Sequence, residues 1–191
     1  MIKEIPGVVV IDDFFPNFER VRNHAILSEF YDWFAADGEL YKRISMLHIP
    51  DMLDSLTNNV GGIKISLSGY RLNYAGEPPN QSIHADLGIS SHVIVVYLNE
   101  GESGTAFWEH KDTGTTEINY GEIEKYEAMK ADFENADAWN QRTVIPAKNN
   151  RAVIYKSNLF HSRYPFEAFG DSPENGRLIA IAFFNFLEDE L

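Results

Sequence analysis

The feature that most constrains the fold is a change in hydrophobic period near residue 63. From Ile63 to Tyr74, apolar and polar residues alternate, as they do along a β-strand with one buried face. Short apolar or β-branched runs then recur, separated by breaks that contain Gly, Pro or Asn. Further strands are expected at residues 92–98, 105–108, 143–145, 152–155 and 178–186. This succession of short strands predicts a β-sandwich or barrel for the second part of the chain.

The first 62 residues have a different pattern. Residues 8–11 are a short β-branched run after Pro6-Gly7 and predict one strand. Helices are expected after Pro16-Asn17, with Asn17 as the N-cap, and again over residues 49–57. Because helices precede a β-rich part, the sequence indicates the α+β class.

A helical pattern interrupts the strands at residues 117–140. Ile123, Tyr126, Met129 and Phe133 are spaced as one apolar stripe of an otherwise charged helix. We expect this stripe to face the barrel, where the insertion could wall or cover the substrate entrance.

Length and composition predict one domain and restrict the partners. A chain of 191 residues is of ordinary size for a single domain, so residues 1–191 are expected to form one. The chain has no cysteine, which excludes disulfides and thiolate metal sites. A net charge of −13 without a long basic run argues against nucleic acid or an anionic membrane as partner. No signal-peptide or bilayer-spanning run is found, so a cytoplasmic location is expected, and the oligomeric state stays open.

Two histidines and one aspartate are the strongest candidates for metal ligands. His84 and Asp86 form a His-x-Asp pair, and His161 follows the apolar run at residues 152–155. Residues i and i+2 of a strand point to the same side, so His84 and Asp86 can reach one point. Two His and one carboxylate form the facial triad of non-haem Fe(II) oxygenases, which leaves positions open for a chelating cosubstrate and O2. The His-x-Asp pair alone is equally well explained as a surface ion pair.

Two arginines could bind anions near such a site. Arg177 lies 16 residues after His161 and opens the strand expected at residues 178–186. A guanidinium forms a fork that matches a carboxylate and stays charged when buried, although a strand-edge Arg can also simply face water. Arg163 follows His161 by two residues and could either meet a substrate anion or pair with one of the many carboxylates.

In combination, these motifs resemble the Fe(II)/2-oxoglutarate-dependent dioxygenases. The resemblance rests on His84-x-Asp86, His161 and Arg177 and covers residues 63–187. The segments 95–99, 104–108 and 160–165 resemble strands of the prolyl-4-hydroxylase-like branch. Within that branch, residues 107–114, FWEHKDTG, resemble a poorly characterised group of hydroxylases with an FWxHKxTG segment.

The resemblance implies a double-stranded β-helix, a distorted jelly roll of the cupin type, with helices packed on one sheet and a helical insertion. It implies that His84, Asp86 and His161 hold Fe(II). It further implies that Arg177 binds 2-oxoglutarate. Many members carry Ser or Thr two residues after this Arg, where Ile179 stands here, so Tyr74 is expected to make the second contact with 2-oxoglutarate.

The implied activity is hydroxylation of a small molecule, an amino acid or a peptide side chain, with O2 consumed and succinate and CO2 released. The substrate stays open, as does an oxidative outcome other than hydroxylation. The alternative is a non-catalytic cupin-like or β-sandwich binding module, in which the His and Asp residues are incidental.

Overall fold

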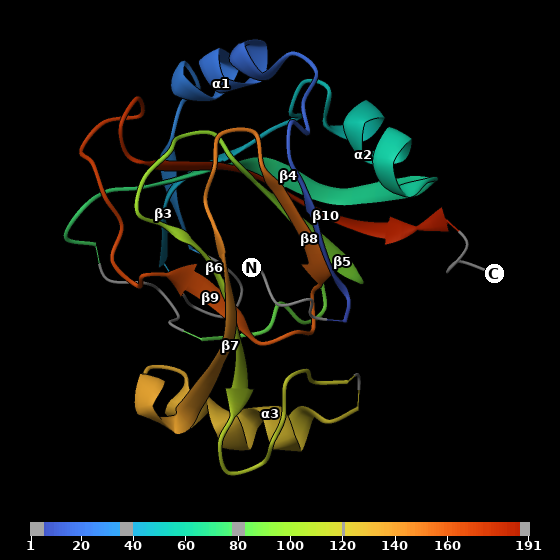
Figure 1. Cartoon of the computed structure of the whole chain (residues 1–191), viewed down its shortest axis with the longest axis vertical. Coiled ribbons are helices and arrows are strands. Elements are labelled where there is room, and N and C mark those ends of the chain that lie inside the picture. The colour runs from blue at the N-terminus through green and yellow to red at the C-terminus, as the bar shows by residue number, and fades with distance from the viewer. Residues whose placement is uncertain (1–5, 35–39, 78–82, 120, 188–191) are drawn as a thin grey trace.

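The computed structural model describes residues 6–34, 40–77, 83–119 and 121–187. Its strands form two antiparallel sheets, one of seven strands in the order β1-β8-β5-β10-β4-β3-β2 and one of three in the order β7-β6-β9 (Figure 1). The strands are β1 (Val8–Ile11), β2 (Tyr31–Phe34), β3 (Leu40–Met46), β4 (Ile63–Asn73), β5 (His92–Tyr97), β6 (Gly104–His110), β7 (Trp139–Pro146), β8 (Ala152–Lys156), β9 (His161–Tyr164) and β10 (Arg177–Phe186).

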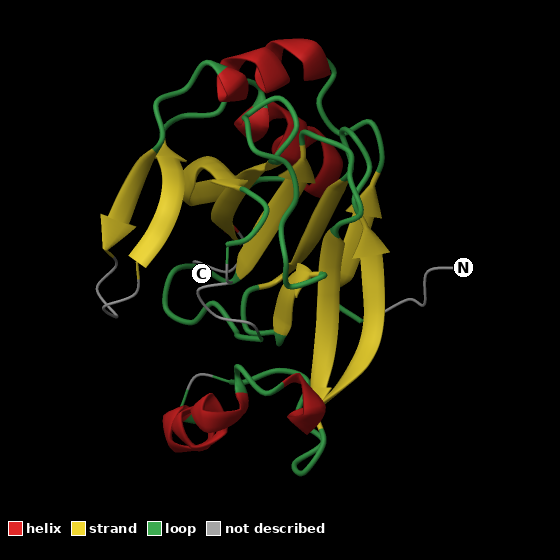
Figure 2. Cartoon of the chain, turned by 90° about the vertical axis from the view of Figure 1, so that its left-hand side faces the viewer, coloured by secondary structure: helices red, strands yellow, loops and turns green. Residues whose placement is uncertain are grey.

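Two helices cover one face of the large sheet, as Figure 2 shows. They are α1 (Phe18–Ile26) and α2 (Met52–Val60). Their apolar residues pack on the even-numbered positions of the central strands, such as Leu72, Ile94 and Ala180. This core exists because period-two alternation sends every second residue of β5, of β10 and of β4 from residue 67 onward to the helical side, while a register shift in the β10–β4 pair puts Ile63 and Ile65 on that side too.

The other face of the large sheet packs against the small sheet. Here the side chains of Val95, Tyr155 and Ile179 meet Phe107 of β6 and Ile145 of β7. Two packed antiparallel sheets with helices on one outer face form a jelly roll, as the sequence predicted. The N-terminal strand, residues 8–11, and most of the later strands lie within about two residues of their expected bounds.

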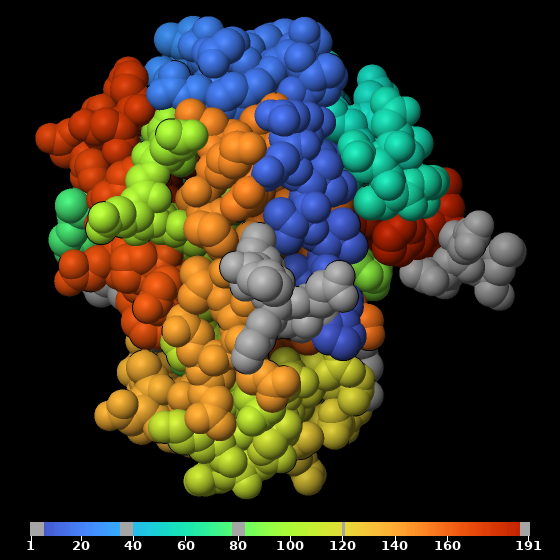
Figure 3. Space-filling model, in the orientation of Figure 1, coloured from blue at the N-terminus to red at the C-terminus, as the bar shows by residue number. Residues whose placement is uncertain are grey.

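The insertion packs on the outer face of the small sheet and forms the lower part of the molecule in Figure 3. It contains α3 (Ile123–Met129) and two short 3-10 turns, Lys130–Asp132 and Ala136–Ala138. Met129 and Phe133 are buried against Trp139 and Phe160, and Tyr126 is half-buried beside them. The expectation for Ile123 was wrong, since its side chain is 64% exposed. The helix begins at Ile123, so this residue lies at its N-terminal end.

Two features of the N-terminal part differ from the sequence prediction. Residues 31–46 contain a β-hairpin, β2 and β3, that extends the large sheet at its edge next to β4. The second helix begins three residues later than expected, at Met52, and the side chain of Asn17 does not cap α1. None of the helices in the described ranges is long and apolar enough to traverse a bilayer.

Candidate metal centre and cofactor cavity

A cavity of about 250 Å³ lies between the two sheets. The residues of β4 and β10 that point away from the helices line it, among them Arg71, Asn73, Arg177 and Ile179. Arg177 lies opposite Asn73 in the β10–β4 pair, so both side chains enter the same end of the cavity. Strand alternation therefore builds a mainly apolar pocket with a few charged groups at fixed positions.

The backbone brings the three candidate ligands together. His84 and His161 form an isolated antiparallel bridge, in which His84 N–H donates to His161 O at 3.0 Å and His161 N–H donates to His84 O at 2.9 Å. Asp86 N–H donates to Ser157 O at 2.8 Å, which fixes the residue two positions further along. His84 belongs to a single bridge and not to a full strand, but the i and i+2 side chains still converge.

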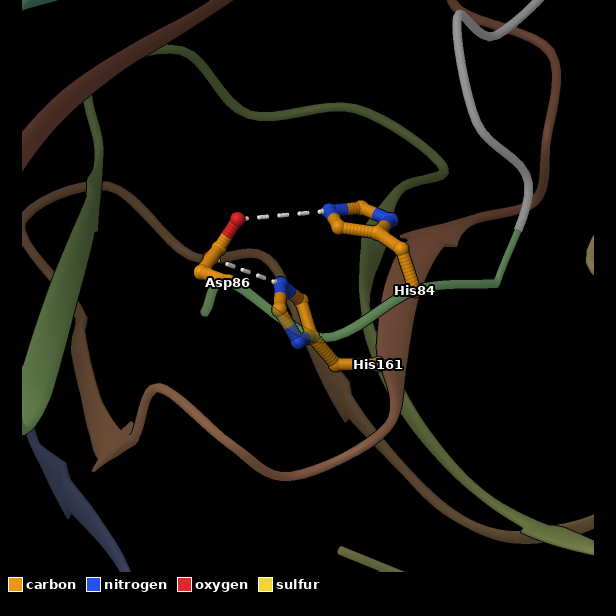
Figure 4. A group of neighbouring side chains, drawn as sticks. All are labelled: His84, Asp86 and His161. Atoms are coloured by element: carbon orange, nitrogen blue, oxygen red, sulfur yellow. Dashed lines mark ion pairs between the residues drawn. The ribbon is translucent and has the colours of Figure 1, made fainter. Parts of the chain in front are cut away.

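The donor atoms of the three side chains face one another, as Figure 4 shows. His84 Nε2 lies 3.7 Å from Asp86 Oδ1, and His161 Nε2 lies 3.3 Å from Asp86 Oδ2. All three donor atoms lie within 4.8 Å of one another. Separations of this size suit three donors on one face of an octahedron around a single ion.

The charge states at this centre also suit a divalent cation. Burial first, and then the neighbouring His161 and Arg71, lower the pKa of His84 to about 3, although the charge of Asp86 opposes the change. Burial works to raise the pKa of Asp86, but the hydrogen bond and charge of His161, with His84 and Arg71, outweigh it and lower the pKa. His84 is therefore neutral and Asp86 ionised near neutral pH, which are the forms that bind metal.

The imidazole of His161 is oriented by the main chain. Its Nδ1 lies 2.9 Å from Leu159 O, and because a carbonyl only accepts, Nδ1 must carry the proton. The lone pair is then on Nε2, which faces Asp86. In metal-ligating histidines, a hydrogen bond from the ring nitrogen that does not bind the metal fixes the tautomer in this way.

Arg177 is a buried cation at the far end of the cavity. Its side chain is only 6% exposed, and Nη1 donates to Asn73 Oδ1 at 3.4 Å. Within the described ranges its Nε has no hydrogen-bond acceptor, and no carboxylate forms an ion pair with it. Burial lowers the pKa of Arg177 to about 10, yet the group stays charged at neutral pH. A buried guanidinium without an acidic partner requires an anionic ligand.

The structure does not bring Tyr74 to this cavity. Tyr74 packs on the helical side with the core that contains Leu72, and the Arg43 guanidinium lies 4.3 Å from the centre of its ring. The reason is strand alternation, since position 74 shares the parity of 72 and not that of Arg71 and Asn73. Asn73 instead stands beside Arg177.

Two further arginines line the cavity, and sequence reasoning singled out only one. Arg71 stacks on Tyr41, with the guanidinium carbon 5.2 Å from the ring centre, and interacts electrostatically with Asp86. Arg163 follows His161 on β9, and burial together with Arg177 and Arg71 lowers its pKa to about 9. Arg71 could have been predicted to face the cavity, because it lies two residues before Asn73 on a strand that the sequence already predicted. Trp33 and Tyr41 were missed because the β2–β3 hairpin was not expected.

Comparison with solved structures shows that this fold is shared with non-haem enzymes. The epimerase SnoN from nogalamycin biosynthesis, described as α-ketoglutarate dependent, has a TM-score of 0.53 at 11% identity, over 93% of this chain and 77% of SnoN. The α-ketoglutarate-dependent carbocyclase SnoK, from the same biosynthesis, has a TM-score of 0.51 at 9% identity, over 94% and 79%. HygX from Streptomyces hygroscopicus, solved with iron bound, has a TM-score of 0.52 at 12% identity, over 95% and 83%. At these identities the likeness establishes the fold, a double-stranded β-helix, and not the reaction.

The chain belongs to a family described as "Family of unknown function (DUF6445)", whose model matches residues 79–184, more than half of the chain. No protein with a curated function matches it. The matched segment contains His84, Asp86, His161 and Arg177, so the three candidate metal ligands and the buried Arg177 lie inside the region that defines the family.

Proposed function

We propose that this protein is an Fe(II)- and 2-oxoglutarate-dependent oxygenase, most simply a hydroxylase of a small molecule, amino acid or peptide side chain. The observation that carries the proposal is the pairing of two sites in one cavity. A His84–Asp86–His161 cluster suited to a divalent cation shares the cavity with Arg177, a buried cation without a carboxylate partner in the described ranges. The fold shared with α-ketoglutarate-dependent enzymes supports the same proposal.

The residues of the chain fit the two groups that such a reaction needs. His84, Asp86 and His161 would hold the metal with one negative charge, leaving positions for other ligands. Arg177 would bind the carboxylate of 2-oxoglutarate that lies away from the metal. Asn73, whose Oδ1 already accepts from Arg177, would donate from its amide nitrogen to that carboxylate, in the role first assigned to Tyr74. Fe(II) and 2-oxoglutarate, when bound, supply the chemistry that converts O2, 2-oxoglutarate and R–H into succinate, CO2 and R–OH.

The surrounding side chains prepare the cavity for this chemistry. Ile179, Ile181 and Phe183 extend along β10 from Arg177 and form one wall. Their apolar surface limits water around the guanidinium and strengthens its interaction with a carboxylate. Tyr155 lies beside His161, with ring centres 4.8 Å apart, and restricts the position of that ligand. The chain thus positions the reactants and excludes water.

The test is 2-oxoglutarate binding to the Fe(II)-loaded protein without O2, followed by succinate formation in air. The proposal predicts binding that depends on the metal, and 2-oxoglutarate-dependent succinate that His161→Ala abolishes. A protein that takes up neither Fe(II) nor 2-oxoglutarate would instead be the non-catalytic binding module. Assignment to the prolyl-4-hydroxylase-like branch and a cytoplasmic location rest on the sequence and stay predictions.

A further inference from the structure

The cavity contains more positive charge than the proposed cosubstrate can balance. Arg71, Arg163 and Arg177 all line it, whereas Asp86 is the ionised carboxylate among its lining residues. A divalent metal ion would add two positive charges, and 2-oxoglutarate brings two negative ones. With Arg177 assigned to 2-oxoglutarate and Arg71 next to Asp86, one cationic side chain, Arg163, has no role in the proposed function. The inference below therefore rests on that proposal.

Arg163 is held in position without being neutralised. Its Nη2 donates to the main-chain carbonyl oxygens of Glu77, at 3.3 Å, and Phe166. Its Nε is buried and lacks an acceptor within the described ranges, where no carboxylate lies at ion-pair distance either. Glu167 acts on it only electrostatically, from an exposed position. The two carbonyl contacts fix the Nη2 end of the guanidinium and leave its other N–H groups to donate to a ligand.

The absence of a carboxylate beside Arg163 in the described ranges does not reflect a shortage of acidic residues. The sequence has 29 Asp and Glu against 16 Lys and Arg, so carboxylates are abundant. Arginines near the surface use them, as in the pair Arg151–Asp12 at 2.6 Å and the pair Arg142–Glu109. Arg163 is half-buried and has no such partner in the part of the chain that the structure describes. Because partial burial of an uncompensated cation is costly, its retention in the cavity indicates a ligand.

The location of Arg163 places that ligand beside the metal centre. Arg163 and His161 are i and i+2 on β9, so both side chains leave the strand on the cavity side, about 7 Å apart along the chain. Across the β6–β9 pair, Arg163 lies opposite Thr105, which also lines the cavity. The same cavity is also lined by the apolar side chains of Ile44, Met46 and Leu67. A substrate held at Arg163 would therefore present a carbon near the metal from an otherwise apolar body.

We propose that the primary substrate carries an oxyanion group, a carboxylate or a phosphate, which Arg163 binds while an apolar part of the molecule lies against the cavity wall. The planar guanidinium fork matches either group in a bidentate manner. Arg163 is then a specificity-determining residue. The chain's overall negative charge does not oppose this, because the local field inside the cavity is positive.

The experiment is an affinity selection on the protein loaded with Fe(II) and N-oxalylglycine, an unreactive analogue of 2-oxoglutarate, without O2. One arm offers N-acetyl amino acids as matched pairs of free acid and primary amide. A second arm offers phosphate monoesters paired with their parent alcohols. Retained compounds are identified by mass spectrometry and their Kd values measured. Because N-oxalylglycine occupies the Arg177 end in every sample, any further anion must use another cation.

The proposal predicts that retained compounds are anionic members of the pairs. Their Kd should rise about 10- to 100-fold in Arg163→Gln, and by less in Arg163→Lys, which keeps the charge but not the fork. The control Arg142→Gln removes one exposed Arg and should leave the Kd unchanged. Retention of amides and alcohols as strongly as of their partners, retention of neither member, or an unchanged Kd in Arg163→Gln would overturn the inference.

Failure of the proposed function has a different result. In that case N-oxalylglycine itself does not bind the metal-loaded wild-type protein. If N-oxalylglycine binds to wild type and to Arg163→Gln alike, but no anionic partner is preferred, only the role of Arg163 is lost. The Kd of N-oxalylglycine in each variant thus separates the two claims and also reports whether Arg163→Gln has folded.

Discussion

Replacing Arg177 with glutamine should weaken 2-oxoglutarate binding strongly without destabilising the free protein. Burial, which disfavours the charged form, lowers the pKa of Arg177 from its ordinary value to about 10. Since the folded state binds this proton less tightly than the unfolded state, the charge costs the free protein about 3 kcal/mol at every pH below 10. That cost disappears as the pH rises through 10 toward 12.5.

The glutamine side chain removes both the cost and the ligand. Without ligand, Arg177→Gln should unfold at a Tm equal to or above that of the wild type, because the relief of the buried charge offsets the packing lost with the longer side chain. Loss of a buried, charge-assisted contact to a carboxylate is worth about 2–4 kcal/mol. The Kd for 2-oxoglutarate should therefore rise about 30- to 1,000-fold.

Calorimetric titration of the Fe(II)-loaded protein under nitrogen measures the Kd, and thermal unfolding measures the Tm. The matched control is Arg142→Gln, which removes the same charge from a side chain that is 54% exposed and paired with Glu109. The control should bind 2-oxoglutarate as the wild type does. A wild-type Kd in Arg177→Gln would refute the assignment of this residue, and a large fall in Tm would refute the claim that its charge is uncompensated.

Two further predictions concern the stability of the fold. Phe133→Ala should lower the free energy of unfolding, measured in urea, by about 3–5 kcal/mol, because Phe133 is buried against Trp139 and Phe160. Ile123→Ala should lower it by less than about 0.5 kcal/mol, because Ile123 is exposed. Equal losses in the two variants would contradict this packing. The hydrogen bond from Arg151, against a smaller opposing effect of burial, lowers the pKa of Asp12 to about 2. The stability that this pair contributes is thus complete above about pH 4 and lost as the pH falls toward 2. Asp12→Asn should remove that part of the dependence of the free energy of unfolding on pH. If this free energy depends on pH in the variant as it does in the wild type, the pair contributes nothing.

Strand positions could be predicted from the sequence because they depend on short-range periodicity, and the convergence of His84 and Asp86 follows from their i, i+2 spacing. The inclusion of His161 in the candidate cluster rested on the family resemblance. Alternation over residues 67–73 places Leu67, Arg71 and Asn73 on the cavity face, and the same rule places Arg177, Ile179 and Ile181 on one wall. Tyr74 shares its parity with Leu72, so the same rule places it on the helical side, where it packs. Local pattern alone would have selected Arg71 and Asn73 as the cavity-facing residues of that strand.

Other features depend on contacts between distant segments and have no local signature. The β2–β3 hairpin forms because β3 pairs with the free edge of β4. The sequence of residues 31–46 has no alternation from which this hairpin could be predicted. The bridge between His84 and His161 joins a loop to the start of β9, far apart in the chain. The surroundings of Arg163 depend on the packing of the loops that contain Glu77 and Phe166, which offer main-chain carbonyl oxygens. In the described ranges no carboxylate partner accompanies them. Such properties emerge only from tertiary structure.

The central claim is that His84, Asp86 and His161 form one metal site, and an anaerobic Fe(II) titration tests it most directly. The wild type should bind one equivalent of Fe(II) per chain. Asp86→Ala and Asp86→Asn should show no stoichiometric Fe(II) binding, although both variants should still unfold cooperatively. The control is Asp132→Ala, which breaks a His–Asp contact elsewhere in the chain, His110 Nε2 to Asp132 Oδ2 at 3.2 Å, and should still bind one equivalent. Stoichiometric Fe(II) in both Asp86 variants, or none in the wild type, would contradict the account.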